Sequence, residues 1–309
     1  MLGLQKLGAL VVAAALAVGC PPWSHHGPGP FNGQAPRTPE VFAPGVISSD
    51  QFEWRITFSP DGRTAFFGRS EGFFPLTRQA TIMMSRYERG KWTEPEVAPF
   101  SGEYPDLDPF ISPDGRTLYF SSIRPVNGRE RTDTDIWMVV KRWDGSWSEP
   151  VHLGDEVNSE ADELFASVDA FGTLYVASDR SGGLGGWDIY RYRPRGLGQF
   201  SPAENLGAPV NTAGWEFNPT ITPDGKTLLF TGLSRQGGAG YGDIYVTRQQ
   251  GRRGWSEPVS VGEPVNTAND EYHPVLSPNL DRLFYVVNGD LHQVSVKSLR
   301  PLAKALGRG

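Results

Sequence analysis

Cysteine is almost absent from this chain of 309 residues, in which Cys20 is the only one. No internal disulfide can therefore hold the fold together, and its stability has to come from burial and hydrogen bonding. Histidine is scarce as well, because the chain has five, and His152, His273 and His292 lie far apart in the sequence. We expect neither a metal centre nor a cofactor, since the usual clusters of soft ligands are missing.

Excess positive charge, long apolar runs and familiar catalytic motifs are missing too. The formal net charge is -6 at neutral pH, which argues against nucleic acid as a partner. The apolar run from Leu7 to Val18 is too short to span a bilayer comfortably. Neither a Gly-x-Ser-x-Gly elbow nor a His-Glu-x-x-His helix occurs. We therefore expect a protein that is not an enzyme.

Turn-forming and aromatic residues are abundant instead, with 37 Gly, 26 Pro, 9 Trp and 10 Tyr. This mixture is typical of many short strands joined by tight turns. The stretch from Ile111 to Phe120 predicts one such hairpin. Pro113-Asp114-Gly115 supplies the residues that a tight turn requires, and Leu118 and Phe120 alternate as in a half-buried strand.

The same hairpin recurs along the chain at a nearly constant period. Its anchor residues are Asp61, Asp114, Asp169, Asp224 and Asn279. The spacings between these anchors are 53, 55, 55 and 55 residues. A fixed period of this size indicates a repeat architecture.

Each repeat contains four strand-like segments, which predicts an all-β, five-bladed β-propeller with four-stranded antiparallel blades. The third segment carries an Asp-Ile-aromatic pattern, as in Asp188-Ile189-Tyr190. The fourth opens on a cluster such as Trp255-Ser256-Glu257-Pro258, where proline suits an edge strand. The last repeat stops near Val296, and Thr38 to Phe42 resembles an orphan fourth strand. We expect this N-terminal strand to join the last blade and close the ring.

Residues 1–20 have the features of a lipoprotein signal peptide ending at Cys20. Lys6 supplies the positive start, and small residues follow the apolar run. Leu16-Ala17-Val18-Gly19-Cys20 resembles the bacterial lipobox, although Ala17 stands where Leu is commonest. The resemblance implies lipidation of Cys20. Because no Asp follows Cys20, it implies an exported outer-membrane lipoprotein that faces the periplasm or the cell surface.

The remaining segments follow from composition. Residues 21–37 are a Pro/Gly-rich tether, expected to be extended and poorly ordered, in which His25-His26 is a plain linker sequence. Residues 38–296 form the propeller. Residues 297–309 are expected to be a basic, frayed and solvated C-terminal tail.

The repeat motifs carry a family resemblance. The pattern Ser-Pro-Asp-Gly-Arg-Thr-Leu at residues 112–118, followed by Asp-Ile-Tyr and Trp-Ser-Glu-Pro clusters, resembles the WD-like propeller repeats of the TolB type. Pro209-Val210-Asn211-Thr212 and Pro264-Val265-Asn266-Thr267 are similar to the variant found beside OmpA-like domains in envelope proteins. The likeness covers residues 38–296. It includes neither the α/β domain of TolB nor an OmpA-like domain, so it does not imply peptidoglycan binding.

One face of the propeller is expected to carry recognition. The loops between second and third strands are longer and more variable than the Ser-Pro-Asp-Gly turns, and variable loops on a rigid frame commonly bind partners. Each first strand begins with an acid: Glu53, Asp106, Glu163, Glu216 and Glu271. In four repeats the second strand ends near an arginine: Arg69, Arg124, Arg180 and Arg235.

Two interpretations of these charges remain open. The acids form a ring that binds a cation or a basic peptide, or each one pairs with its arginine across the hairpin. The fifth repeat has Asn288 in place of the arginine and His273 two residues after Glu271, so this spot is asymmetric. Loop aromatics are a second candidate platform for sugar or protein: Phe73, Phe74, Trp187, Trp215, Tyr241 and Tyr272.

The sequence thus favours a non-enzymatic, lipid-anchored envelope propeller that binds a protein or another ligand through its loop face. The alternative is a glycan-active hydrolase or lyase on a propeller scaffold, which would need paired carboxylates. Acids available for that role are Asp106, Asp108, Asp162 and Glu163. An envelope protein is the expected partner and a glycan the alternative ligand, while nothing in the sequence indicates an oligomeric state.

Overall fold

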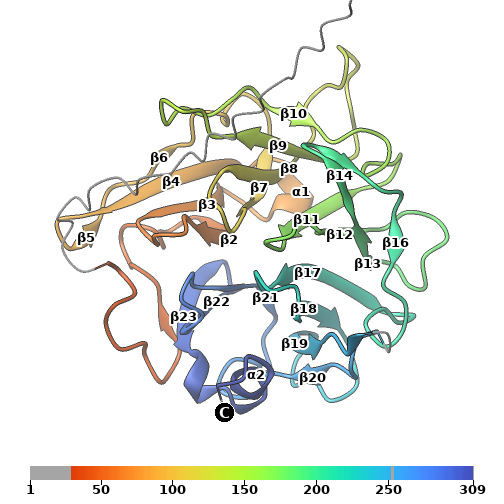
Figure 1. Cartoon of the computed structure of the whole chain (residues 1–309). Helices are drawn as coiled ribbons and strands as arrows, with labels where there is room; N and C mark the ends of the chain where they lie inside the picture. The colour runs from red at the N-terminus through yellow and green to blue at the C-terminus, as the bar shows by residue number, and fades with distance from the viewer. Residues whose placement is uncertain (1–28, 252–253, 309) are drawn as a thin grey trace, which may run out of the picture.

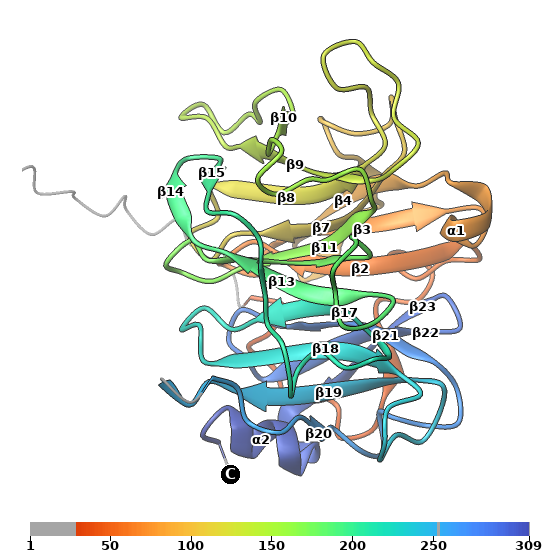
Figure 2. The same cartoon turned by 90° about the vertical axis from the view of Figure 1, so that its right-hand side faces the viewer.

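The computed structural model describes residues 29–251 and 254–308. Five four-stranded antiparallel sheets stand around a common axis, so the chain is a five-bladed β-propeller, as predicted (Figure 1). Seen from the side, the strands run between two faces, with α1 (Phe74–Thr77) on one face and the hairpin of β14 (Pro194–Gly196) and β15 (Gln199–Phe200) toward the other (Figure 2).

The blades follow one another along the chain. The first contains β2 (Phe52–Phe58), β3 (Thr64–Ser70), β4 (Thr81–Glu88) and β6 (Glu96–Val97), with β5 (Lys91–Trp92) on the end of β4. The second contains β7 (Asp106–Ile111), β8 (Thr117–Ser122), β9 (Asp135–Val140) and β10 (Val151–His152). The third contains β11 (Glu163–Val168), β12 (Leu174–Ser178), β13 (Asp188–Tyr192) and β16 (Glu204–Asn205).

The last two blades complete the ring. The fourth contains β17 (Trp215–Ile221), β18 (Thr227–Leu233), β19 (Gly242–Arg248) and β20 (Val259–Ser260). The fifth contains β21 (Glu271–Leu276), β22 (Arg282–Val287) and β23 (Asp290–Ser295), and its outer strand is β1 (Glu40–Val41). Val41 pairs with His292 and Glu40 with Gln293. The predicted closure by the N-terminal strand is therefore confirmed.

The recurring turns have the hydrogen bonds that their sequence predicts. In the second blade the Gly115 N–H donates to the Ser112 carbonyl at 2.8 Å. The Asp114 carboxylate accepts from the Ser112 hydroxyl at 2.5 Å and from the Arg116 N–H at 3.0 Å. Gly115 has a φ of 73°, a conformation that glycine adopts without strain. We call the side of the molecule that carries these turns the turn face.

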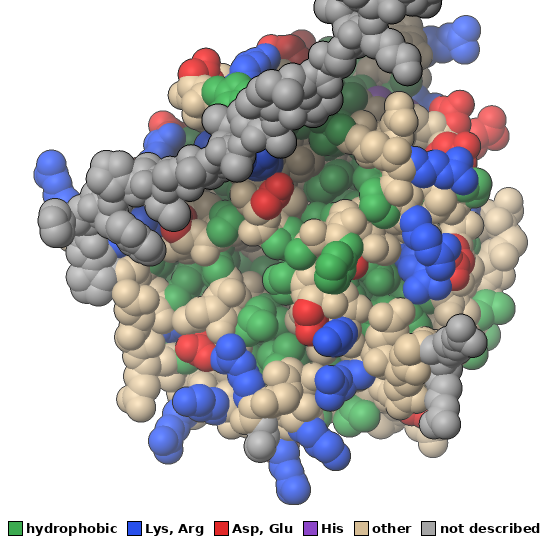
Figure 3. Space-filling view, in the orientation of Figure 1, with side chains coloured by type: hydrophobic (Ala, Val, Ile, Leu, Met, Phe, Trp, Pro, Cys, Tyr) green, Lys and Arg blue, Asp and Glu red, His purple; other side chains and the backbone are tan. Residues whose placement is uncertain are grey.

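The turn face is the one seen in Figures 1 and 3. On it, hydrophobic side chains gather around the middle of the ring, and Lys and Arg side chains lie mostly around its edge (Figure 3). The opposite side carries the loops between second and third strands, and we call it the loop face. Among the described residues, no helix is both long and apolar enough to cross a membrane.

The C-terminal segment is not the frayed, solvated tail that its basic residues suggested. Residues Val296–Ser298 form the 3-10 turn η2, and Arg300–Ala305 form helix α2. Leu299 and Leu302 are fully buried in a core cluster of the fourth and fifth blades. The prediction was wrong because the apolar residues between the basic ones give the segment a face to bury.

Part of the predicted tether is also packed. Phe31 is buried, and its ring centroid lies 4.9 Å from that of Phe58. The Asn279 side-chain amide donates to the Phe31 carbonyl at 3.1 Å. An ordered residue at this point corrects the expectation for the end of the tether. Cys20, the lipobox and His25-His26 lie outside the described residues.

Candidate functional site

The five predicted acids are the first or second residues of the first strands of the five blades, and all are fully buried. Four of them pair with the predicted arginines. The N–O distances are 3.0 Å for Arg69–Glu53, 2.6 Å for Arg124–Asp106, 2.9 Å for Arg180–Glu163 and 3.1 Å for Arg235–Glu216. The structure thus places these residues in a cross-strand pair repeated from blade to blade, and the four carboxylates are not exposed to a ligand.

Each pair also ties a blade to the link that precedes it. The Ser159 N–H and hydroxyl both donate to Glu163, at 2.7 Å each, and Thr212 does the same to Glu216. Arg180 donates onward to the Val157 carbonyl at 2.6 Å. Burial raises the pKa of all five carboxyl groups, and the hydrogen bonds oppose that rise. The ring of acids therefore holds each blade to the link that precedes it.

The fifth blade lacks the arginine, as its sequence indicated. Glu271 accepts hydrogen bonds from the Thr267 N–H at 3.0 Å and from its hydroxyl at 2.6 Å. Asp243 and Asp270 contribute further negative charge, which adds to the upward shift of the Glu271 pKa caused by burial. This site remains the asymmetric one among five otherwise similar positions.

A second ring of residues, two positions after each acid, meets at the centre of the propeller. Its members are Arg55, Asp108, Phe165, Asn218 and His273. In every blade the register of the first two strands shifts at this point. Asp108 and His273, for example, have φ values of 53° and 55°. Such a bulge re-aims a side chain, and the side chains of Asp108, Phe165 and Asn218 all approach His273.

His273 is the hub of these contacts. Its Nδ1 lies 3.1 Å from the Asn218 Nδ2 and 3.4 Å from an Asp108 carboxyl oxygen. The ring centroid of Phe165 is 5.4 Å away, in an edge-to-face arrangement. The buried Arg55 donates to the Pro219 carbonyl at 2.7 Å, and its charge acts on both Asp108 and His273. Residues from all five blades therefore contribute to one polar cluster, which we call the axial cluster.

The hydrogen bonds fix the tautomer of His273. The backbone N–H of His273 donates to Asn218 Oδ1 at 3.1 Å, so the side-chain amide nitrogen of Asn218 faces the imidazole. An amide nitrogen only donates, and the imidazole Nδ1 must then accept. The ring proton is therefore on Nε2, the nitrogen that does not face Asn218. Burial and the nearby Arg55 lower the pKa of His273 to about 3, so the ring is neutral.

Asp108 is buried without a hydrogen-bond donor among the described residues, because neither of its carboxyl oxygens has a partner. Burial raises the pKa of Asp108 to about 7, and the positive charge of Arg55 opposes the rise. The guanidinium Nε and Nη1 of Arg55 likewise have no hydrogen-bond partner in the described part of the chain, and burial lowers the pKa of Arg55 to about 10. Buried polar atoms without partners are costly, and buried groups with strongly shifted pKa values cluster at functional sites.

The axial cluster lies at the base of a cavity on the loop face with a volume of about 470 Å³. Asp108 and His273 line its floor, and aromatic side chains from four blades line its walls: Trp54, Phe73, Phe165, Trp187, Trp215, Phe217, Tyr241 and Tyr272. Trp215 and Tyr241 are 47% and 58% exposed. The predicted loop aromatics thus meet in one place, except for Phe74, whose side chain lies outside the described residues.

The loops that carry these aromatics are held by a repeated device. The buried Asp243 accepts from the Ala239 and Gly240 N–H groups at 3.0 Å and 3.2 Å, and Asp188 accepts likewise in the preceding blade. At Gly240 a Cβ atom would lie 2.1 Å from the Asn269 carbonyl of the next link. The walls of the cavity are therefore built on closely packed backbone.

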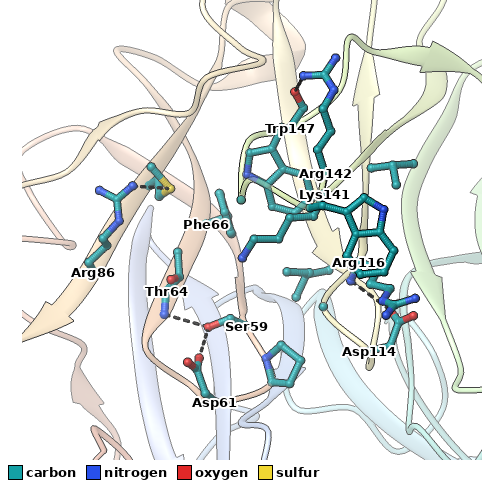
Figure 4. A pocket seen from close by; sticks show the side chains of 17 residues that line it. Ser59, Asp61, Thr64, Phe66, Arg86, Asp114, Arg116, Lys141, Arg142 and Trp147 are labelled. Atoms are coloured by element: carbon teal, nitrogen blue, oxygen red, sulfur yellow. Dashed lines mark hydrogen bonds between the residues drawn. The ribbon is translucent and has the colours of Figure 1, made fainter. Parts of the chain in front are cut away.

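A second hollow, of about 730 Å³, lies between the first two blades on the turn face (Figure 4). Arg86, Arg116 and Lys141 line it, together with Trp147. Arg86 pairs with Glu96 at 2.5 Å, and the Arg116 guanidinium lies 5.6 Å from the Trp143 ring. These groups already have partners, so the cavity on the loop face is the better candidate site.

Sequence reasoning identified His273 and Asp108 separately and missed Arg55, Phe165 and Asn218. These five residues all lie two positions after a first-strand acid, and their type differs from repeat to repeat. That combination was the signal from which the axial positions could have been predicted. Across the described residues, no group of three or more His, Cys, Asp or Glu side chains is placed to hold a metal ion.

A ring of five such blades with an axial site defines the chain as a β-propeller protein, and solved structures share this fold. It is similar to the putative TolB from Agrobacterium tumefaciens, with a TM-score of 0.50 and 19% identity over 77% of this chain and 71% of that one. For TolB from Acinetobacter baumannii the TM-score is 0.48 and the identity 17%, over 81% and 56%. The chain therefore spans just over half the length of that protein.

Enzymes appear among the structural neighbours as well. A thermostable family-43 glycoside hydrolase has a TM-score of 0.51 and 11% identity over 81% of this chain and 90% of that one. At these identities the likeness shows the fold alone. No protein-family model matches the sequence, and no curated protein matches it either.

Proposed function

We propose that this propeller is a non-enzymatic binding scaffold of the bacterial cell envelope, and that its loop face receives a protein or another ligand. The observation that carries the proposal is the aromatic cavity above the axial cluster. Concave sites with apolar walls and a few convergent polar groups are the usual form of a binding site. Two of its aromatic side chains, Trp215 and Tyr241, are about half exposed and free to contact a ligand.

The envelope location is proposed on the sequence. The signal-like residues 1–20 and the lipobox-like segment ending at Cys20 support export and a lipid anchor in the outer membrane. The protein would then present its loop face to partners in the periplasm or at the cell surface.

Crosslinking in intact cells tests the proposal. A photo-crosslinker at Leu184, which is exposed in a loop of the third blade, is expected to capture a defined partner. The double variant Trp215→Ala/Tyr241→Ala should abolish that capture. Trp143→Ala is the matched control, since Trp143 is 98% exposed and lines the hollow on the turn face. If the double variant retains every crosslinked product, the loop face is not the binding surface.

A specific observation also supports the glycan-active alternative. Asp108 and Asp162 line the same cavity, and a buried carboxyl group with a pKa near 7 has the property of a general acid. Asp106 and Glu163, the other acids considered, are paired with arginines. Cleavage of a glycosidic bond in a panel of oligosaccharides, lost in Asp108→Asn, would establish the enzyme and displace the scaffold proposal.

A further inference from the structure

The walls of the cavity provide flat apolar surfaces at several angles. The wall residue Trp54 is tilted at 53° to Phe73, and it stacks on Phe52, which is not itself a wall residue, with an interplanar angle of 12°. Phe217 lies beside Phe165 and Tyr272, with centroids 5.8 Å apart in both cases. Such rings bind the apolar face of another ring, whether that ring is aromatic or a sugar.

The floor of the cavity presents a hydrogen-bond donor. His273 is neutral and carries its proton on Nε2, because its Nδ1 accepts from Asn218. Its side chain is 7% exposed and lines the cavity. A ligand that fills the cavity without an acceptor at this point would leave a buried donor unpaired, at a cost in affinity. The floor therefore selects a ligand with an oxygen at its inner end.

The charges around the cavity balance one another. At the floor, the Asp108 carboxyl group interacts with the positive charge of Arg55, which opposes the rise of the Asp108 pKa. At the rim, Arg78 lies 3.7 Å from Asp162 and donates to the Thr132 carbonyl at 2.7 Å. A cationic ligand would face the Nε2–H and the charge of Arg55, and an anionic ligand would face Asp108 and Asp162. Neither sign is favoured, so the site fits a neutral ligand.

We propose that the cavity binds a neutral saccharide, with one sugar ring against the aromatic walls and a sugar oxygen accepting the Nε2–H of His273. The inference rests on the proposed function, because it names the ligand of the same site. A sugar carries apolar faces and a polar edge, which matches apolar walls between a polar floor and the polar rim of Asp162 and Tyr241. A phenylalanine or tryptophan side chain from a partner protein would match the walls and leave the floor unpaired, because neither carries an acceptor.

Titration with soluble oligosaccharides tests this inference on the protein without its signal segment. The probes are neutral hexose and pentose oligosaccharides, with uronic-acid and glucosamine oligosaccharides as charged counterparts. Trp54, Trp187 and Trp215 line the cavity, so their fluorescence and calorimetry should both report saturable binding of a neutral probe. The charged counterparts should bind at least about tenfold more weakly, as expected when a charge is buried without a partner.

The variants follow the propeller's own repeats. Phe165 and Asn218 occupy the position of His273 in the third and fourth blades, with φ values of 63° and 52° against 55° for His273. His273→Phe and His273→Asn are therefore compatible with the backbone, and thermal unfolding checks that they fold. His273→Phe removes the donor and should weaken neutral binding about tenfold or more. Trp215→Ala should weaken it similarly, and Trp143→Ala on the turn face should not change it.

The outcomes separate the inference from the proposed function. Preferred binding of a charged probe, no binding of any neutral probe, or neutral binding unchanged in both His273→Phe and Trp215→Ala overturns the saccharide assignment. If no sugar binds and the crosslinked partner is still lost in Trp215→Ala/Tyr241→Ala, the scaffold stands without the saccharide. If a neutral saccharide binds and is cleaved, the saccharide assignment holds and the non-enzymatic function fails.

Discussion

The backbone of Val41 pairs with that of His292, so strands from opposite ends of the chain share one blade. Phe42 follows this pairing, with its N–H donating to the Leu291 carbonyl at 2.7 Å. Its ring packs edge-on against Phe284 at 5.0 Å and Phe58 at 6.0 Å. The closure of the ring is thus held by an aromatic cluster as well as by the strand pair.

Replacing Phe42 should open this closure. We expect Phe42→Ala to lower the free energy of unfolding by about 3–5 kcal/mol, because a buried aromatic ring is lost and a cavity remains. Val97→Ala is the matched control, since Val97 lies in the outer strand of the first blade and is half exposed. Urea unfolding measures both. A cost for Phe42→Ala no larger than that for Val97→Ala would show that the closure contributes little.

Breaking one of the repeated acid–arginine pairs should also be costly. In Arg124→Ala the carboxylate of Asp106 would stay buried without its cation, and such changes typically cost about 3–5 kcal/mol. Adding Asp106→Asn should recover part of the loss, because the remaining side chain is uncharged. Arg116→Ala, at an exposed position of the same hairpin, should cost less than about 1 kcal/mol. Chemical unfolding of the unaltered protein and the three variants measures these free energies. Equal losses for Arg124→Ala and Arg116→Ala would contradict the prediction.

The axial cluster predicts opposite pH dependences for two variants. The folded-state pKa of Asp108 is raised from 3.8 to about 7, so its contribution to stability is present below pH 3.8 and is lost as the pH rises through about 7. The folded-state pKa of His273 is lowered from 6.5 to about 3, so its contribution is present above pH 6.5 and is lost as the pH falls through about 3. In the unaltered protein the two trends largely cancel.

Removing one group should reveal the trend of the other. In His273→Phe the remaining Asp108 should make the protein less stable as the pH rises from about 4 to about 7. In Asp108→Asn the remaining His273 should make it less stable as the pH falls from about 6.5 toward 3. Each change is on the order of 4 kcal/mol across its window. Free energies of unfolding measured across this pH range test the signs. Two variants whose stability changes in the same direction would show that the groups are not coupled in this way.

The C-terminal helix should be part of the folded structure. Leu302 is fully buried against the fourth and fifth blades, and the Thr227 hydroxyl donates to the Ala305 carbonyl at 3.2 Å. We expect Leu302→Ala to cost about 2–5 kcal/mol. Lys304→Ala, at an exposed position of the same helix, should be nearly neutral. Thermal unfolding distinguishes them, and a neutral Leu302→Ala would restore the interpretation of a loosely attached tail.

The architecture could be predicted because it repeats. The turn around Asp114 and its four counterparts fix the period of the repeat. The last repeat lacks its fourth strand after Val296, and residues 38–42 supply that strand. The helix at residues 300–305 and the packing of Phe31 do not repeat. Their places depend on apolar surface that only the assembled blades expose, so local patterns gave no indication of them.

The sequence by itself determined the number of blades and the order of strands in each, because these features depend on local spacing that recurs in every repeat. It left open whether the first-strand acids pair with their arginines or bind a ligand, and the structure shows the pairs in four blades. Only the tertiary structure decided the axial cluster and the aromatic cavity. Asp108 and His273 are far apart along the chain and come within 3.4 Å only because the ring closes. The axial positions recur in every repeat, but each carries a different residue type, so the repeat pattern does not show which side chains meet at the axis.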